Sequence, residues 1–146
     1  MTRVDAAATV PGTVEQVRAL WFDLDRWPAI VDGFAAVVRM DEGWPQRGEL
    51  VWDSTPHGRG RVIERADGTF EDERLSGTQT LAFEPTGRGV VVRLAQDYRI
   101  KERTALTPLL DLFFIRRAVR DSLVRTVRRF AAEARMEDDL RSGRMT

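Results

Sequence analysis

TVEQVRALWFDLDRWPAIVDGF, residues 13–34, is the stretch that decides the fold of this 146-residue chain. Thr13 and Gln16 have the spacing of a capping box, so we expect a helix to begin there. Pro28 suits the start of a second, shorter helix, because the first position of a helix needs no amide hydrogen. The stretch therefore predicts two short helices in series, with Trp21 in the first and Trp27 at the start of the second.

The sequence around this stretch alternates apolar and polar side chains, which is typical of half-buried strands. One strand is expected before it, at residues 3–10. Six more are expected after it, at residues 34–40, 48–54, 59–66, 69–75, 78–84 and 89–101. Asp67-Gly68 suits a type I′ hairpin turn, and Ser76-Gly77 is expected to join the next two strands. The middle of the chain is therefore predicted to be an antiparallel meander.

The last part of the chain has the apolar spacing of a helix. From Pro108 to Met136 apolar residues recur at steps of three or four, which predicts a helix of roughly 40 Å. A helix of this length needs a broad apolar surface, which the sheet supplies. Residues 137–146 show no such spacing and are expected to form a flexible tail.

The order strand, two short helices, six strands and one long helix, together with Trp21-x5-Trp27-Pro28, resembles the START-like (SRPBCC) superfamily. The closest resemblance is to its polyketide cyclase/dehydrase and lipid-transport branch, and it covers nearly the whole chain. It implies an α+β helix-grip fold, in which a seven-stranded antiparallel curved sheet wraps around a long C-terminal helix. It also implies a single ligand-binding domain over residues 1–136, with a cavity for an apolar ligand between sheet and helix.

Composition limits the classes of function. Acidic and basic residues balance at 23 each, so no bulk charge attracts nucleic acid. The chain has no cysteine, which excludes disulfides and thiolate catalysis. No apolar run is long enough to cross a bilayer, so we expect a cytoplasmic protein without stable membrane insertion. No metal, phosphate-loop or dinucleotide motif is present, and we expect no metal and no cofactor.

The cavity lining is predicted from strand alternation and from the apolar face of the long helix. In the strand at residues 89–101, Leu94, Gln96 and Tyr98 share one face, which we expect to point inward. The full set of expected ligand-binding residues is Trp27, Phe34, Trp52, Phe70, Phe83, Leu94, Gln96, Tyr98, Leu112, Ile115 and Val119.

Each polar candidate residue has two possible roles. Buried Gln96 and Tyr98 must bond either to protein and water or to the polar end of a ligand. Asp72 and Arg74 form either a partly buried pair that can bind a ligand oxygen, or two solvated charges at a sheet edge. His57 is the only histidine, and it is either solvated in its turn or a general acid/base.

Three functions follow from these readings. The first is binding of a hydrophobic small molecule, such as a lipid, an isoprenoid or a polyketide-like aromatic. The second is a polyketide cyclase, aromatase or dehydratase in the same cavity, with Tyr98, Arg74, Asp72 and His57 as candidate catalytic residues. The third is a toxin–antitoxin or co-chaperone type interaction module, which an exposed apolar patch at Leu109–Phe114 without a usable cavity would favour.

The outer face of the long helix carries its own alternatives. It is either solvated or docks transiently on an anionic membrane surface or an acidic carrier protein. The apolar run at Leu109–Phe114 is expected to line the cavity, gate its entrance or form a homodimer contact. The basic face consists of Arg116, Arg117, Arg120, Arg125, Arg128 and Arg129, with Asp121 the single acid among them.

Overall fold

The computed structural model describes residues 1–102 and 108–143. Its strands are β1 (Thr2–Val10), β2 (Phe34–Met40), β3 (Glu49–Ser54), β4 (Arg61–Arg65), β5 (Thr69–Glu71), β6 (Leu75–Thr86) and β7 (Gly89–Ile100). Its helices are α1 (Val14–Trp21), the 3-10 turn η1 (Leu24–Arg26), α2 (Trp27–Ile30) and α3 (Leu109–Ser142). This is the predicted order of elements.

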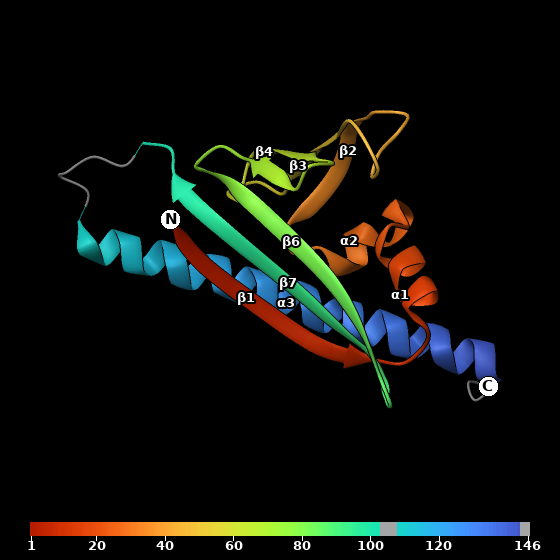
Figure 1. Cartoon of the computed structure of the whole chain (residues 1–146). Helices are drawn as coiled ribbons and strands as arrows, with labels where there is room; N and C mark the ends of the chain where they lie inside the picture. Colours follow the sequence, from red (N-terminus) through yellow and green to blue (C-terminus); the bar gives the residue numbers. More distant parts are fainter. Residues whose placement is uncertain (103–107, 144–146) are drawn as a thin grey trace.

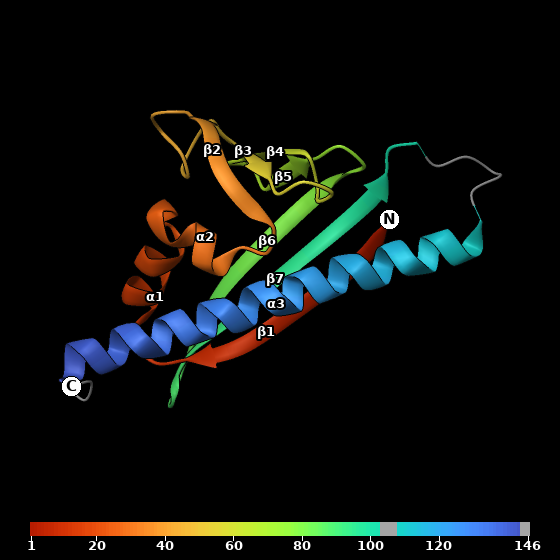
Figure 2. The same ribbon diagram turned by 180° about the vertical axis from the view of Figure 1, so that it is seen from behind.

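All strands pair antiparallel in one sheet, in the order β1-β7-β6-β5-β4-β3-β2. Figures 1 and 2 show the long strands β1, β7 and β6 running beside α3, while the shorter strands curl away from it. The helices α1 and α2 occupy the side that this curl leaves open. The predicted helix-grip architecture is confirmed.

Two apolar clusters hold the layers together. In the larger one, Phe130 of α3 is fully buried and meets the edge of the Trp21 ring, with the ring centroids 5.1 Å apart. The smaller one fills the space between α2 and the curled end of the sheet. Its buried members are Trp27, Phe34, Leu50, Trp52 and Val62.

The segment that joins β1 to β2 is organised as its sequence predicts. The Thr13 hydroxyl accepts the amide hydrogen of Gln16, and the Gln16 side chain accepts that of Thr13, which completes the capping box. Farther on, the Trp27 Nε1–H donates a buried hydrogen bond of 2.7 Å to the carbonyl oxygen of Trp21. The Trp-x5-Trp spacing therefore closes the chain between α1 and α2.

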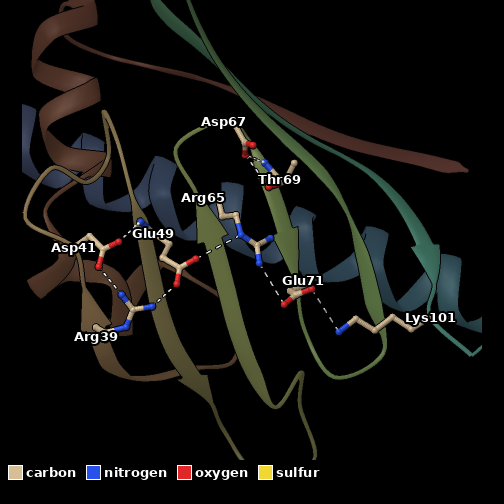
Figure 3. Close-up of polar contacts among 8 residues, drawn as sticks. All are labelled: Arg39, Asp41, Glu49, Arg65, Asp67, Thr69, Glu71 and Lys101. Atoms are coloured by element: carbon tan, nitrogen blue, oxygen red, sulfur yellow. Dashed lines mark hydrogen bonds and ion pairs between the residues drawn. The ribbon is translucent and has the colours of Figure 1, made fainter.

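The outer face of the sheet, opposite α3, carries a ladder of ion pairs (Figure 3). Arg39 pairs with Glu49, and Arg65 lies 3.5 Å from Glu49 and 3.4 Å from Glu71. Lys101 extends the ladder with its amine 4.0 Å from the Glu71 carboxylate. These charges mark the outer side of the sheet, whereas Leu50, Trp52, Val62 and Phe70 of the same strands are buried in the two apolar clusters.

The predicted turn at Ser76-Gly77 is wrong, because the chain turns earlier. The Asp72 carboxylate accepts the amide hydrogens of Arg74 at 2.9 Å and Leu75 at 2.8 Å, which bends the backbone directly after β5. Ser76 and Gly77 lie inside β6 and pair with β5 on one side and β7 on the other. A carboxylate that caps its own turn thus ends the strand at Glu71, four residues sooner than predicted.

The hairpin at Asp67-Gly68 is present, but its turn type differs from the prediction. Strands β4 and β5 pair antiparallel across it. Gly68 has a φ of 91°, whereas Asp67 is not among the residues with positive φ, and a type I′ turn needs both. The Asp67 carboxylate instead accepts the amide hydrogen of Thr69 at 2.9 Å.

The predicted tail is wrong for residues 137–142, because α3 continues to Ser142. Arg26 of η1 pairs with Glu133 at 3.2 Å and also with Glu137, which holds this end of the helix by charge. Such contacts leave no apolar periodicity in the sequence. The helix ends at Gly143, whose φ of 72° is left-handed, and residues 144–146 lie outside the described part.

Gly77 tests how closely β6 and β7 approach. A Cβ atom at this position would lie 1.9 Å from the carbonyl oxygen of Asp97, a backbone atom that cannot swing aside. We expect Gly77→Ala to lower the free energy of unfolding by about 3 kcal/mol in urea denaturation.

The matched control is Gly87, in the turn that follows β6. A Cβ there meets nothing within 4 Å. Gly87→Ala should change the free energy of unfolding by less than about 0.5 kcal/mol. Equal losses in the two variants would contradict the close approach at Gly77.

Candidate functional site

A cavity of about 160 Å³ lies between the inner face of the sheet, α2 and the middle of α3. We call it the first cavity. Its volume is close to that of an engineered cavity of roughly 150 Å³ that binds benzene. Its apolar walls come from Trp21, Trp27, Val31, Trp52, Leu75, Leu94, Ala118, Val119 and Leu123.

A row of hydrogen-bonded polar groups crosses the floor of the first cavity. Gln96 Nε2 of β7 donates to Gln79 Oε1 of β6 at 2.8 Å, and Gln79 Nε2 donates to Glu64 Oε1 of β4 at 3.2 Å. Trp52 Nε1 of β3 donates to Glu64 Oε2 at 2.7 Å. We call Trp52, Glu64, Gln79 and Gln96 the polar row. It places one carboxyl group, with a donor on each oxygen, inside a largely apolar chamber.

The carboxyl group of Glu64 has a raised pKa. Burial raises its pKa above the usual 4.5, and this outweighs the hydrogen bond from Trp52, the charge of Arg59 and the hydrogen bond from Gln79, which all lower it. A carboxyl whose pKa moves toward neutrality inside a cavity can exchange a proton with a bound molecule.

Beside the row, Arg59 and Asp72 form an ion pair. Arg59 Nε donates to the buried Asp72 carboxylate at 2.9 Å. The guanidinium carbon of Arg59 also lies 5.4 Å from the Trp52 ring centroid and 5.6 Å from that of Phe70. Stacking and the ion pair fix one cation at the cavity wall.

Asp32 ties the rim of the first cavity to α3. Its carboxylate accepts from Ser122 Oγ at 2.9 Å and from Arg125 Nε at 3.0 Å, and its amide donates to Thr126 Oγ1 at 2.9 Å. Burial opposes ionisation of this carboxyl, but the hydrogen bonds from Arg125 and Ser122 and the charges of Arg125 and Arg129 hold its pKa below the usual 3.8. The rim is therefore an ionised, hydrogen-bonded junction.

A second cavity, of about 170 Å³, lies on the other side of the two tryptophans. It shares Trp21, Trp27, Glu64 and Gln79 with the first cavity, so these four side chains form a common wall. Its outer side is lined by Phe22, Trp44, Pro45, Arg65, Ala66, Gly68, Thr69, Phe70 and Leu81. Glu64 thus faces both chambers.

The structure brings together part of the predicted ligand-binding set. Trp27, Trp52, Leu94, Gln96 and Val119 line the first cavity, and Phe70 lines the second. The remaining members lie outside both linings. They are Phe34, which packs behind Trp27 and Trp52, Phe83, which lies beneath the Arg18 guanidinium, and Tyr98, Leu112 and Ile115.

Gln96 and Tyr98 are both buried, as expected, and both have protein partners. Gln96 bonds to Gln79 within the polar row, whereas the Tyr98 hydroxyl is hydrogen-bonded to the Thr2 side chain of β1. Burial raises the pKa of Tyr98, which opposes ionisation of the phenol. Tyr98 lies away from both cavities, so it is not positioned to act on a molecule held in either of them.

The other polar candidate residues, Asp72, Arg74 and His57, do not lie at one site. Asp72 lines the first cavity, but its partner is Arg59 rather than Arg74, which is exposed. Arg74 and the exposed His57 border a surface hollow outside the sheet. Neither of the two alternatives for this pair holds in full, because Asp72 is buried against Arg59 while Arg74 is exposed beyond the turn.

Sequence reasoning missed Arg59, Glu64 and Gln79. A signal for Glu64 was present, because alternation in residues 59–66 places it on the same face as Val62, which is fully buried. The strand patterns of β4 and β6 could not show that Glu64 and Gln79 meet, because the short β5 lies between them. Among the residues described, no three acidic or histidine side chains converge as a metal site.

Comparisons with known proteins agree with this architecture. A protein-family model described as polyketide cyclase/dehydrase and lipid transport matches residues 1–135. A search of curated protein sequences finds no significant match. Within the described residues, no helix combines the length and apolar character needed to cross a bilayer.

Solved structures of similar shape include two aromatase/cyclases. One domain of the di-domain aromatase/cyclase StfQ from the steffimycin pathway matches with a TM-score of 0.69 and 22% identity, covering 97% of this chain and 51% of StfQ. The Zhui aromatase/cyclase of a Streptomyces species matches with a TM-score of 0.67 and 15% sequence identity, covering 97% of each chain. A Thermus thermophilus protein matches with a TM-score of 0.68 and 17% sequence identity, covering 91% of this chain and 97% of the Thermus chain.

The raised pKa of Glu64 makes stability depend on pH. In the unfolded chain this carboxyl loses its proton near 4.5, while in the folded protein it keeps the proton to higher pH. The folded state therefore binds more protons in that interval and loses stability as the pH rises through it. We expect NMR titration of the Glu64 carboxyl carbon to give a midpoint above 4.5.

Glu64→Gln is the matched variant, because it keeps the shape and cannot ionise. Between pH 4.5 and pH 7 the free energy of unfolding of the native protein should fall relative to that of the variant. Parallel pH profiles for the two proteins, or an NMR midpoint at or below 4.5, would contradict the assignment.

Proposed function

Because this chain belongs to the polyketide cyclase/dehydrase and lipid transport family, we propose that it binds a small hydrophobic molecule in the first cavity, with one polar end against the polar row. The observation that carries the proposal is the row itself. Apolar walls surround a few convergent polar groups, which is the usual composition of a small-molecule site.

The size of the chamber limits the ligand. A volume of about 160 Å³ suits one ring, or a short branched chain, rather than a fused multi-ring molecule. A longer molecule needs the second cavity as well, and the wall between the two consists of side chains rather than backbone strands. Among the ligands expected from the sequence, a single-ring aromatic or isoprenoid fragment fits best.

The polar groups define the ligand's polar end. Glu64 supplies a hydrogen-bond acceptor and, when protonated, a donor, while Arg59 supplies a fixed positive charge. A neutral molecule with one hydroxyl or keto oxygen satisfies these groups. A fully apolar ligand leaves the row without a new partner and gains only contact with the walls.

Identification of the ligand tests the proposal directly. Native mass spectrometry of the protein purified from its own host, followed by extraction, should recover a small molecule of single-ring size with an oxygen function. Repeated recovery of empty protein, with no thermal shift across panels of lipids and aromatic compounds, would refute the binding function.

Filling the first cavity should weaken binding strongly. Val119 of α3 is half-buried and lines the chamber, so Val119→Trp places an indole where the ligand would lie. With para-propylphenol as the probe, we expect the variant's dissociation constant in calorimetry to rise by about a hundredfold, which is roughly 2.7 kcal/mol.

Val124→Trp is the matched control, because Val124 is equally half-buried on α3 but does not line either cavity. Its dissociation constant for para-propylphenol should lie within about threefold of the native value, which is a difference of less than roughly 0.7 kcal/mol in binding free energy. Equal weakening by both variants would place the probe elsewhere.

A second candidate function, polyketide cyclisation, is favoured by the carboxyl of Glu64 and the guanidinium of Arg59 at one cavity. Glu64 as a base would remove a proton from the methylene between two ketones, and Arg59 would stabilise the resulting enolate. The aromatase/cyclase names of two structural neighbours belong to those proteins, and at 22% and 15% identity the likeness carries the fold alone.

Glu64→Gln separates catalysis from binding. If Glu64 is the base, the variant should bind para-propylphenol within about threefold of the native affinity but cyclise a poly-β-keto chain at least roughly a hundredfold more slowly. Chromatographic analysis of the cyclised products gives the rates. A native rate no faster than the spontaneous reaction would leave binding as the sole function.

A further inference from the structure

The first turns of α3 leave four large apolar side chains in solvent. Leu109, Leu110, Phe113 and Phe114 are 82%, 65%, 57% and 55% exposed. We call these four residues the apolar end of α3. In Figures 1 and 2 this end of the helix extends past the neighbouring ends of β1 and β7. A contiguous exposed apolar patch of this kind marks a surface that contacts another protein or a membrane.

Three arginines follow in the next turns. Arg116, Arg117 and Arg120 are exposed, and together with Phe113 and Asp121 they line a surface hollow. Asp121, the single acid in that lining, lies 4.0 Å from Arg117. The hollow therefore has an excess of positive charge directly beside an exposed aromatic ring.

Apolar and cationic groups lie on one face of the helix. Leu110, Phe113, Phe114 and Arg117 occupy positions i, i+3, i+4 and i+7, which share a side of an α-helix. The opposite side packs inward through Ile115 and Val119. This arrangement matches a helix that lies in the plane of a membrane interface, with its rings among the acyl chains and its arginines at the headgroups.

The flank of α3 next to this face borders the first cavity. Ala118 is exposed and lines the cavity, and it lies one turn beyond Phe114. Val119 and Ser122 continue that lining along α3. A surface that covers the apolar end of α3 therefore lies next to Ala118, where the lining of the first cavity reaches solvent.

We propose that the apolar end of α3 and Arg116, Arg117 and Arg120 dock on the surface of an anionic lipid bilayer. A second copy of the chain on the same patch would bring three arginines against three arginines. An acidic protein would match the charge but has no evident need for four exposed apolar side chains. A bilayer with anionic headgroups supplies both partners, and this contact goes beyond the binding of a small ligand.

Vesicle sedimentation tests the proposal with the full chain. Vesicles of phosphatidylcholine with about 30% phosphatidylglycerol should retain the protein at about 0.05 M salt and release most of it at about 0.5 M. Pure phosphatidylcholine vesicles should bind at least roughly tenfold more weakly. Arg117→Glu with Arg120→Glu, and separately Phe113→Ser with Phe114→Ser, should each weaken binding to anionic vesicles by about tenfold or more.

Matched controls lie farther along the same helix. Arg128 is exposed and lines neither cavity, and Leu140 is 57% exposed near the other end of α3. Arg128→Glu and Leu140→Ser should keep binding within about twofold of the native level, since neither lies on the patch. Three results would overturn the proposal: no sedimentation with anionic vesicles, equal losses in the controls, or a dimer that the Phe113/Phe114 variant dissociates in size-exclusion chromatography.

Discussion

The hydrogen bond from the Trp27 indole to the Trp21 carbonyl is the constraint on which the remaining structure depends. A buried indole N–H without a partner would cost on the order of 1–3 kcal/mol, so α2 is held where this bond can form. The geometry sets both rings against the sheet and α3, with Trp21 on Phe130 and Trp27 on Phe34. The same two rings then form the wall between the cavities. One local contact therefore closes the fold and shapes its interior.

The polar row explains how the interior tolerates a carboxyl group. Each hydrogen bond in the row satisfies a group that would otherwise be buried unpaired, and no buried side-chain polar atom among the described residues lacks a partner. Pairing does not remove the cost of burying a charge, which remains visible in the raised pKa of Glu64. An apolar residue there would fill the space with less penalty. The proposed role of Glu64 toward a bound molecule rests on this buried titratable group facing two cavities.

The fold could be predicted from the sequence because its causes are local. Alternation predicts the strands, and the capping box and the Trp-x5-Trp-Pro spacing predict the two short helices. The site could not be predicted to the same extent, because its polar contacts join residues far apart in the chain. Arg59 meets Asp72, and Glu64 meets Gln79, only after the register of three strands is set. The end of α3 was missed for a similar reason, since Arg26 holds it through Glu133 and Glu137 rather than through apolar packing.

The ion-pair ladder on the outer face has a consequence for the chemistry of the surface. Lys101 is the only lysine of the chain, and it lies at the end of that ladder beside Glu71 (Figure 3). Every other cationic side chain of the ladder is a guanidinium, which does not react with amine-selective reagents. An active ester therefore has one side-chain target besides the α-amino group. A dye or tether attached to Lys101 lies on the face of the sheet opposite α3, so the molecule carries a single side-chain attachment point that leaves its interior untouched.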